Sequence, residues 1–221
     1  MMGKTEITDQ FHRLFYNSPG TWANIRWLGV PILKCPMDLV VYQEIIVELQ
    51  PDLIIETGTC HGGSARFMAS ICDELGKGEI ISIDIDPKPD LPVHPRISFW
   101  KSSSVAREVI QALEEKTEGL ERVMVILDSD HRKPHVVQEL KHYRQFVTVG
   151  SYLIVEDTNI NGHPVRADFG PGPMEAVDKL LSLDDDFVID AEREKFFMTF
   201  NPRGFLKRVK KTDTPWGTSN T

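Results

Sequence analysis

The sequence is poor in cysteine, in long apolar runs and in surplus positive charge, and each shortage excludes a class of protein. It has three cysteines, Cys35, Cys60 and Cys72, which are too few and too scattered for a disulfide framework or a zinc cluster. A reducing cytosol is the simplest compartment for such a chain, so we expect a cytoplasmic protein. No run approaches the roughly 20 apolar residues of a membrane-spanning helix, and the polar first residues do not resemble a signal peptide.

The charge balance is acidic, with 33 Asp and Glu against 25 Lys and Arg, a formal net charge of −8. Because phosphate binding needs surplus Lys and Arg on one face, we do not expect a nucleic-acid-binding protein. The length of 221 residues fits one domain with a sizeable core. These numbers suit an enzyme that acts on a small molecule.

From Pro51 onward, short apolar runs alternate with longer amphipathic ones. The predicted strands are residues 53–55, 80–83, 97–100, 123–127 and 152–155. The predicted helices are residues 64–75, 105–117, 134–146 and 174–183. Nearly continuous apolar strands alternating with helices predict a doubly wound, mostly parallel α/β sheet. Two later apolar stretches, 187–189 and 196–200, are candidates for a closing hairpin.

The chain divides into three parts on these patterns. Residues 1–50 form an N-terminal extension that we expect to be helical, with helical spacing near Phe11 and across residues 39–49. Residues 51–205 form the α/β domain, and residues 206–221 form a basic and then polar tail that we expect at the surface.

The first strand ends in a glycine-rich loop at residues 56–64. Glycines at such a turn let the backbone pass close to a ligand, and the following helix points free N–H groups at the same space. A dinucleotide-binding loop needs a middle glycine, but Cys60 stands between Gly58 and Gly63. Glu56 would repel a phosphate, whereas a cofactor with an amino group and a sulfonium would be attracted to it. The loop therefore favours S-adenosylmethionine over a dinucleotide.

Asp84 follows the second predicted strand, where a carboxylate can accept both hydroxyls of a ribose. The same spacing suits NAD, so Asp84 indicates a nucleoside and does not identify it.

Three carboxylates follow two neighbouring predicted strands: Asp128 after one, and Glu156 and Asp157 after the other. Paired strands lie about 4.8 Å apart, so these groups would converge on a small volume. Clustered oxygen ligands suit a hard divalent cation such as Mg²⁺. The sequence therefore predicts a metal site, with solvated loop acids as the alternative.

His131 lies three residues after Asp128, at the mouth of the same predicted site. Its ordinary pKa near neutrality suits a general base, although a single loop histidine is more often a surface residue. We predict catalytic roles for Asp128 and His131.

Together these motifs resemble the cephalosporin hydroxylase/rhamnosyl O-methyltransferase-like family of class I methyltransferases, which is similar in layout to catechol O-methyltransferase. The motifs that carry the resemblance are residues 51–59, 62–65, 82–85, 127–131 and 156–158, with 27–31 and 43–46 upstream. The resemblance covers most of residues 20–200.

The resemblance implies a seven-stranded sheet whose last strand is antiparallel, with S-adenosylmethionine in the glycine loop. The cofactor-binding residues would be Glu56, Gly58, Thr59, Gly62, Gly63, Ser64, Asp84 and Ser103, with Glu56 at the methionine end and Ser103 near the adenine. Asp128, Glu156 and Asp157 match the metal ligands, and His131 stands where catechol O-methyltransferase has a basic lysine. The Glu156–Asp157 pair replaces an Asp–Asn pair, so the metal preference does not transfer directly.

These observations predict an O-methyltransferase that acts on a hydroxyl of a sugar, phenol or natural-product intermediate. A metal-dependent oxygenase or hydrolase on the same fold is one alternative. An iron oxygenase is expected to use two histidines and one carboxylate, whereas this site has three carboxylates and at most one nearby histidine, which favours magnesium and methyl transfer. A non-catalytic subunit that binds S-adenosylmethionine is a further alternative. The N-terminal extension is a candidate subunit contact, so a homo-oligomer stays open, and residues 159–173 are a candidate lid.

Overall fold

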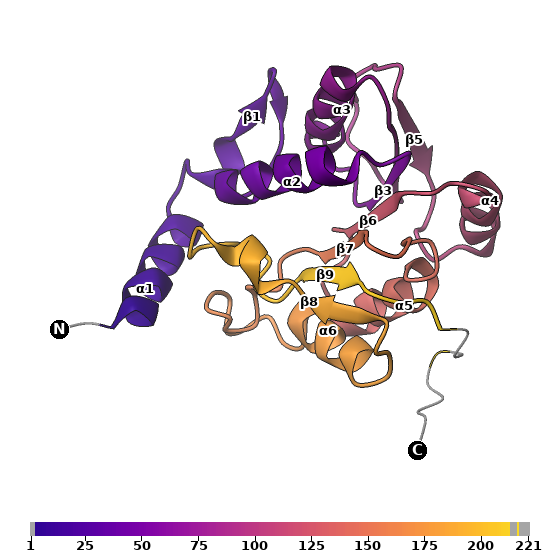
Figure 1. Cartoon of the computed structure of the whole chain (residues 1–221). Coiled ribbons are helices and arrows are strands. Elements are labelled where there is room, and N and C mark those ends of the chain that lie inside the picture. The colour runs from indigo at the N-terminus through magenta and orange to yellow at the C-terminus, as the bar shows by residue number, and fades with distance from the viewer. Residues whose placement is uncertain (1–2, 213–215, 217–221) are drawn as a thin grey trace.

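A seven-stranded sheet with helices on both faces forms the body of the molecule (Figure 1). The computed structural model describes residues 3–212 and residue 216, so part of the predicted tail lies outside the described residues. The helices are α1 Lys4–Asn17, α2 Pro36–Leu49, α3 Gly63–Leu75, α4 Arg107–Thr117, α5 Lys133–Tyr143 and α6 Pro173–Leu181, with short 3-10 turns at Trp22–Asn24 and Ala191–Glu194. The strands are β1 Arg26–Trp27, β2 Val30–Pro31, β3 Leu53–Thr57, β4 Glu79–Asp84, β5 Ile97–Lys101, β6 Val123–Leu127, β7 Tyr152–Val155, β8 Phe187–Ile189 and β9 Phe205–Arg208.

The strand order of the large sheet is β5-β4-β3-β6-β7-β9-β8. Strands β5, β4, β3, β6 and β7 are parallel to one another, and β9 is antiparallel to both β7 and β8. The order reverses at β3, which lies between β4 and β6. In open α/β sheets ligands bind outside the carboxyl ends of the strands at such a switch point. The predicted fold class, including the antiparallel last strand, is confirmed.

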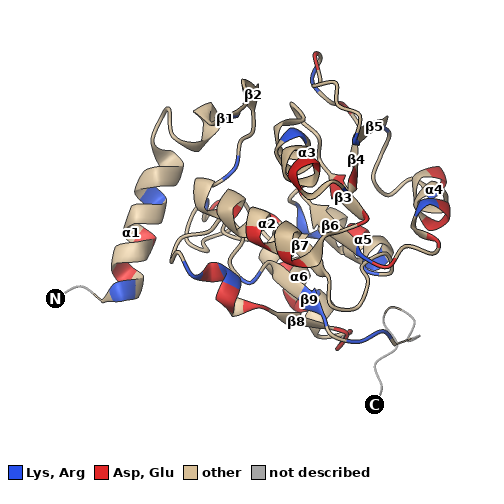
Figure 2. Cartoon of the chain, turned by 45° about the horizontal axis from the view of Figure 1, so that its top comes forward, with Lys and Arg blue, Asp and Glu red and all other residues tan. Residues whose placement is uncertain are grey.

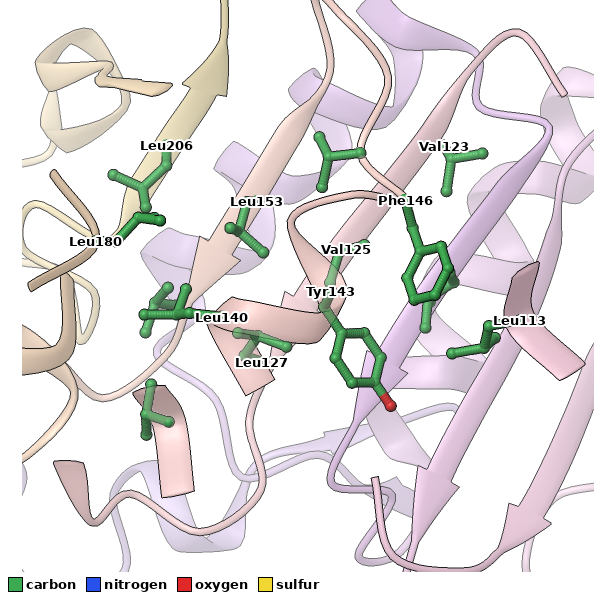
Figure 3. Packing of buried hydrophobic residues seen from close by; sticks show 14 of the residues in the cluster. Leu113, Val123, Val125, Leu127, Leu140, Tyr143, Phe146, Leu153, Leu180 and Leu206 are labelled. Carbon is green, nitrogen blue, oxygen red and sulfur yellow. The ribbon is translucent and has the colours of Figure 1, made fainter. Parts of the chain in front are cut away.

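Two apolar layers enclose the sheet because both faces of its central strands are buried. One layer packs α4, α5 and α6 against the sheet, where Leu113, Tyr143 and Leu180 meet β-strand residues such as Val125 and Leu153 (Figure 3). On the other face, α2 and α3 pack against alternate residues of the same strands. The alternation of side chains along a strand thus divides each apolar run between two cores.

Helix α2 is part of the core of the α/β domain rather than of a separate extension. Its side chains Val41, Tyr42, Ile45 and Ile46 are buried against the sheet, together with Ile54 of β3. The predicted division at residue 50 therefore follows the change in sequence pattern and not the packing, because the apolar face of α2 packs against α3 and the sheet.

The hairpin predicted from residues 187–189 and 196–200 is half wrong. β8 is where it was expected, but its partner is β9, and residues 196–200 form turns that approach α1. β9 pairs with β7 through Leu153 and Leu206, so the predicted boundary after residue 205 cuts through a strand of the sheet. Within this run only residues 198–200 are buried, and Phe200 contacts the N-terminal helix, whereas Phe196 and Phe197 are exposed.

Helix α1 is joined to the body through aromatic contacts with Phe200. The imidazole of His12 stacks on the Phe200 ring with centroids 5.6 Å apart, and the Asn159 amide nitrogen lies 2.9 Å from His12 Nε2. Burial lowers the pKa of His12 to about 4, so the imidazole is neutral at physiological pH and can accept that amide hydrogen.

Charged residues of both signs are interspersed along α1 and α4 (Figure 2). Within the described part of the chain, no helix is both long and apolar enough to cross a membrane.

Candidate active site

The loop after β3 is held between the ends of β4 and β6, the two strands that flank β3 in the sheet. Gly58 has φ +88°, and its N–H donates to the Ile83 carbonyl at 2.8 Å. A Cβ added at Gly58 would lie 1.9 Å from the Asp128 carbonyl oxygen, so no side chain fits. The loop therefore lies against the β6 terminus because residue 58 is glycine.

Helix α3 begins at Gly63, one residue before its predicted start, and the N-terminal segment packs against that end. A Cβ at Gly63 would lie 2.1 Å from the Pro31 carbonyl oxygen. Pro31, Ile32 and Leu33 consequently form one wall of the space that the free N–H groups of α3 face.

Glu56 lies beneath the loop and is fully buried. Its carboxylate accepts hydrogen bonds from the Ser64 hydroxyl and, at 2.5 Å, from the Ser82 hydroxyl. Burial raises the pKa of Glu56 to about 7, against the opposing effects of Lys34 and the two serines. The carboxylate thus ties the start of α3 to β4, and Glu56 is not among the residues that line the cavity described below.

Asp84 holds the same loop from the side of β4. Its Oδ2 accepts the Cys60 N–H at 2.9 Å, and its Oδ1 accepts the Asp86 N–H at 2.8 Å. Each oxygen retains a lone pair, and Asp84 still borders the cavity, so a ribose remains a suitable partner.

Three side chains from two strand ends bring ligand atoms together: Asp128 after β6, and His131 and Asp157 nearby. One ligand atom from each lies within 4.8 Å of the others, and His131 Nε2 is 3.1 Å from Asp157 Oδ2. Leu127 and Val155 are paired in the sheet, so Asp128 and Glu156 leave it at the same level. The backbone turns at Asp157, where φ is +52°. The Asp157 carboxylate lies close to that of Asp128, as predicted.

Glu156 does not join this group. Its Oε1 accepts the Lys34 ammonium at 2.5 Å and also the Tyr42 hydroxyl, and the side chain is 3% exposed. The structure therefore brings together two of the three predicted metal ligands, Asp128 and Asp157, and adds His131 to them. Glu156 and Asp157 lie in the turn after β7, and with φ +52° at Asp157 the two adjacent side chains face different partners.

The donor set suits a divalent cation. Burial raises the pKa of the Asp128, Glu156 and Asp157 carboxyl groups, and Lys34 and His131 offset this only in part. A cation beside them would favour the ionised form, which is the form that binds metal. Two carboxylates with water or substrate oxygens are a common way to hold Mg²⁺.

The loop and the carboxylates open into one cavity of about 790 Å³. Six of the predicted cofactor residues line it: Gly58, Thr59, Gly63, Ser64, Asp84 and Ser103. Asp128, His131 and Asp157 line it as well, and Trp22 and Leu33 border it from the N-terminal segment. Gly62, like Glu56, is outside this lining and shapes the loop with φ +73° at the start of α3.

Sequence reasoning missed Lys34 and Tyr42, which come from the N-terminal part of the chain. The Lys34 ammonium lies 2.5 Å from Asp128 Oδ2, and the Tyr42 hydroxyl connects Glu156 to the Asn201 amide at 3.2 Å. One signal was present: Lys34 is a single charged residue in the apolar segment 30–37. A lysine in such a segment is seldom buried unless it is paired.

Comparison with known proteins gives one family over nearly the whole chain. The family model Rhamnosyl O-methyltransferase/CmcI matches residues 19–209. The rhamnosyl O-methyltransferase of Mycobacterium tuberculosis is 40% identical over 211 residues, covering 91% of this chain and 85% of that protein. The protein of the same name from Mycobacterium leprae is 38% identical over 208 residues, covering 91% and 90% of the two chains.

Solved structures similar to this chain have the same fold. CmcI with Mg and SAM superposes with a TM-score of 0.66 at 18% identity, covering 89% of this chain and 84% of that chain. The methyltransferase MycE, in complex with Mg, SAH and mycinamycin VI, gives a TM-score of 0.54 at 17% identity, with 80% and 51% coverage.

Proposed function

Because the chain belongs to the Rhamnosyl O-methyltransferase/CmcI family, we propose that it transfers the methyl group of S-adenosylmethionine to a hydroxyl of a sugar or sugar-bearing natural product. The observation that carries the proposal is the shared cavity: Asp128, His131 and Asp157 border the same space as the glycine loop. A donor held by the loop and an acceptor held by the carboxylates would meet there.

The donor would occupy the cavity along the loop after β3. Asp84 would accept the ribose hydroxyls, and Ser103, which lies farther along the edge beside β5, would face the adenine. Tyr143 supports this end, since its hydroxyl donates to the Ser104 carbonyl at 2.7 Å and fixes the β5–α4 connection. When bound, S-adenosylmethionine supplies an electrophilic methyl group.

The metal would be held by Asp128 and Asp157, with Mg²⁺ the ion that the oxygen donors favour. When bound, a divalent cation lowers the pKa of an acceptor hydroxyl and orients it. Glu156 was predicted as a third ligand. Its contacts with Lys34 and Tyr42 instead support a positioning role, in which Glu156 holds the ammonium that contacts Asp128.

His131 would take the proton of the acceptor hydroxyl. If Nε2–H donates to Asp157 Oδ2 across their 3.1 Å separation, Nδ1 is left as the acceptor atom. Asp157 therefore sets the imidazole tautomer through Oδ2, and its other oxygen is free for a metal. The cavity walls would exclude water and hold the reacting atoms in line, so positioning supplies much of the acceleration.

We expect His131→Gln to lower kcat by about 10²-fold, which is the lower range for loss of a general base. The affinity for S-adenosylmethionine should stay unchanged, because the predicted donor contacts lie elsewhere on the cavity wall. Steady-state kinetics and calorimetry would measure the two effects. His142→Gln, near the end of α5 and outside the cavity, is the matched control and should keep full kcat. An unaffected kcat in His131→Gln would remove the base from the mechanism.

The acceptor class is tested by a methyl-transfer assay with labelled S-adenosylmethionine, Mg²⁺ and rhamnosyl-bearing, other glycosidic and phenolic acceptors. We expect methylation of a glycosyl hydroxyl that stops when a chelator removes the metal and returns when Mg²⁺ is added. Oxygen consumption dependent on iron, without the methyl donor, would favour an oxygenase. Binding of the donor without methylation of any acceptor would favour a non-catalytic subunit.

A further inference from the structure

Lys34 is a buried cation at the edge of the proposed metal site. It lies on the short segment between β2 and α2, and its side chain is 4% exposed. Its ammonium is 2.5 Å from both Asp128 Oδ2 and Glu156 Oε1. The preceding residue, Leu33, has φ +50°, so the backbone turns there and directs the chain toward the carboxylates.

The surroundings keep Lys34 charged. Burial alone would lower its pKa, but Asp128, Glu156 and Glu56 together raise the pKa well above its usual value. A charged group in the protein interior acts strongly on its neighbours because water does not screen it. The ammonium therefore shares Asp128 with any ion held between Asp128 and Asp157.

We propose that Lys34 is an internal counter-ion that competes with the divalent metal for Asp128 and so weakens metal binding. In the metal-free protein it neutralises part of the carboxylate cluster and stabilises the fold. In the loaded protein it repels the metal and occupies one Asp128 oxygen. The inference rests on the proposed metal site, and it explains how a buried acidic cluster stays folded without its ion.

A purely structural role makes the opposite prediction. If Lys34 only held Asp128 in the orientation that binds metal, its removal would misplace the carboxylate, and the affinity for metal would fall. The two roles therefore differ in the sign of the change in affinity, which does not depend on any activity measurement.

The test is Lys34→Met in the full chain, a replacement of similar length without the charge. We expect the chelator-treated variant to melt at a lower temperature than the metal-free wild type, because Asp128 and Glu156 lose their counter-ion. We expect Mn²⁺ to bind it about tenfold more tightly than the wild type, a typical size for coupling between neighbouring sites. Calorimetry and the electron paramagnetic resonance signal of free Mn²⁺ would measure the affinity.

Tyr42→Phe is the matched control, because it removes a neutral hydroxyl from Glu156 and leaves all charges in place. Its Mn²⁺ affinity should equal that of the wild type. If Lys34→Met does not fold without metal, the same comparison is made between Glu156→Gln and the double variant Lys34→Met/Glu156→Gln. The double variant lacks both charges of the buried Lys34–Glu156 pair. Relative to Glu156→Gln alone, the loss of Lys34 should again tighten Mn²⁺ binding.

The outcomes separate this inference from the proposed function. Tighter Mn²⁺ binding in either comparison, with Tyr42→Phe unchanged, supports the inference. Equal or weaker binding without Lys34 overturns it and leaves the metal site standing. A wild type that binds no Mn²⁺ overturns the metal site itself.

Discussion

Asp128→Asn is expected to lower kcat/KM by about 10³-fold, since losing a metal ligand removes several kcal/mol of charge stabilisation at the acceptor. The amide keeps the shape of the carboxylate, so the fold should be retained. The side chain has lost its charge, however, and the pairing that Asp128 makes with Lys34 at 2.5 Å weakens. Methyl-transfer kinetics with and without added Mg²⁺ would measure the loss, and circular dichroism would check the fold.

Asp86→Asn provides the control for this prediction. Asp86 follows β4, its side chain is 85% exposed, and its contact with Lys101 at 3.5 Å is a surface ion pair of little energetic weight. It should keep wild-type kinetics. Full activity of Asp128→Asn, unaffected by a chelator, would contradict the metal-assisted mechanism, although donor binding by the glycine loop would be untouched.

Gly58→Ala is expected to destabilise the protein by about 3 kcal/mol and to weaken binding of S-adenosylmethionine by about tenfold. The new Cβ would lie 1.9 Å from the Asp128 carbonyl oxygen and 2.5 Å from its carbonyl carbon. Both are backbone atoms, so the loop or the β6 terminus must move. Because that movement displaces a wall of the cavity, stability and donor affinity should fall together.

Thermal unfolding should show the loss of stability as a drop of about 10 °C in Tm, at about 2–4 °C per kcal/mol for a chain of this length. Gly76→Ala separates steric overlap from backbone strain. Gly76 also has positive φ, +71°, but an added Cβ meets nothing within 4 Å. It should cost only about 1 kcal/mol and leave donor affinity unchanged. If the two variants behaved alike, the tight contact between residue 58 and β6 would not matter for the cofactor loop.

Local pattern was sufficient for most of the sheet. β3, β6 and β7 are nearly continuous apolar runs, and α3 begins one residue from its predicted start, because a buried parallel strand and a glycine-opened helix each leave a mark within a few residues. The last strand was misplaced because residues 196–200 are as apolar as a strand. Apolar residues report burial, and Phe200 is buried by aromatic contacts with α1 and not by strand pairing.

Part of the site could also be predicted from local pattern, because its residues follow strands that the pattern identifies. Strand order in a doubly wound sheet places the ends of β3, β4, β6 and β7 on one edge, so Gly58, Asp84, Asp128 and Asp157 could be assigned to one cavity from their positions after strands. The sequence could not show which of two adjacent carboxylates faces the metal site. Glu156 and Asp157 are adjacent in sequence, and only their side-chain directions separate a group that faces Lys34 from one that faces His131.

By itself, then, the sequence determined the doubly wound sheet, the glycine loop after β3, and the family to which these motifs are similar. Each of these depends on residue types within short windows or on their order along the chain. The tertiary structure decided which cation faces the carboxylates. Lys34 and Asp128 are 94 positions apart, and their contact exists only because the β2–α2 segment packs over the cofactor loop at Gly63. Contacts between segments so distant leave no periodic mark in the sequence, since they depend on how whole elements pack.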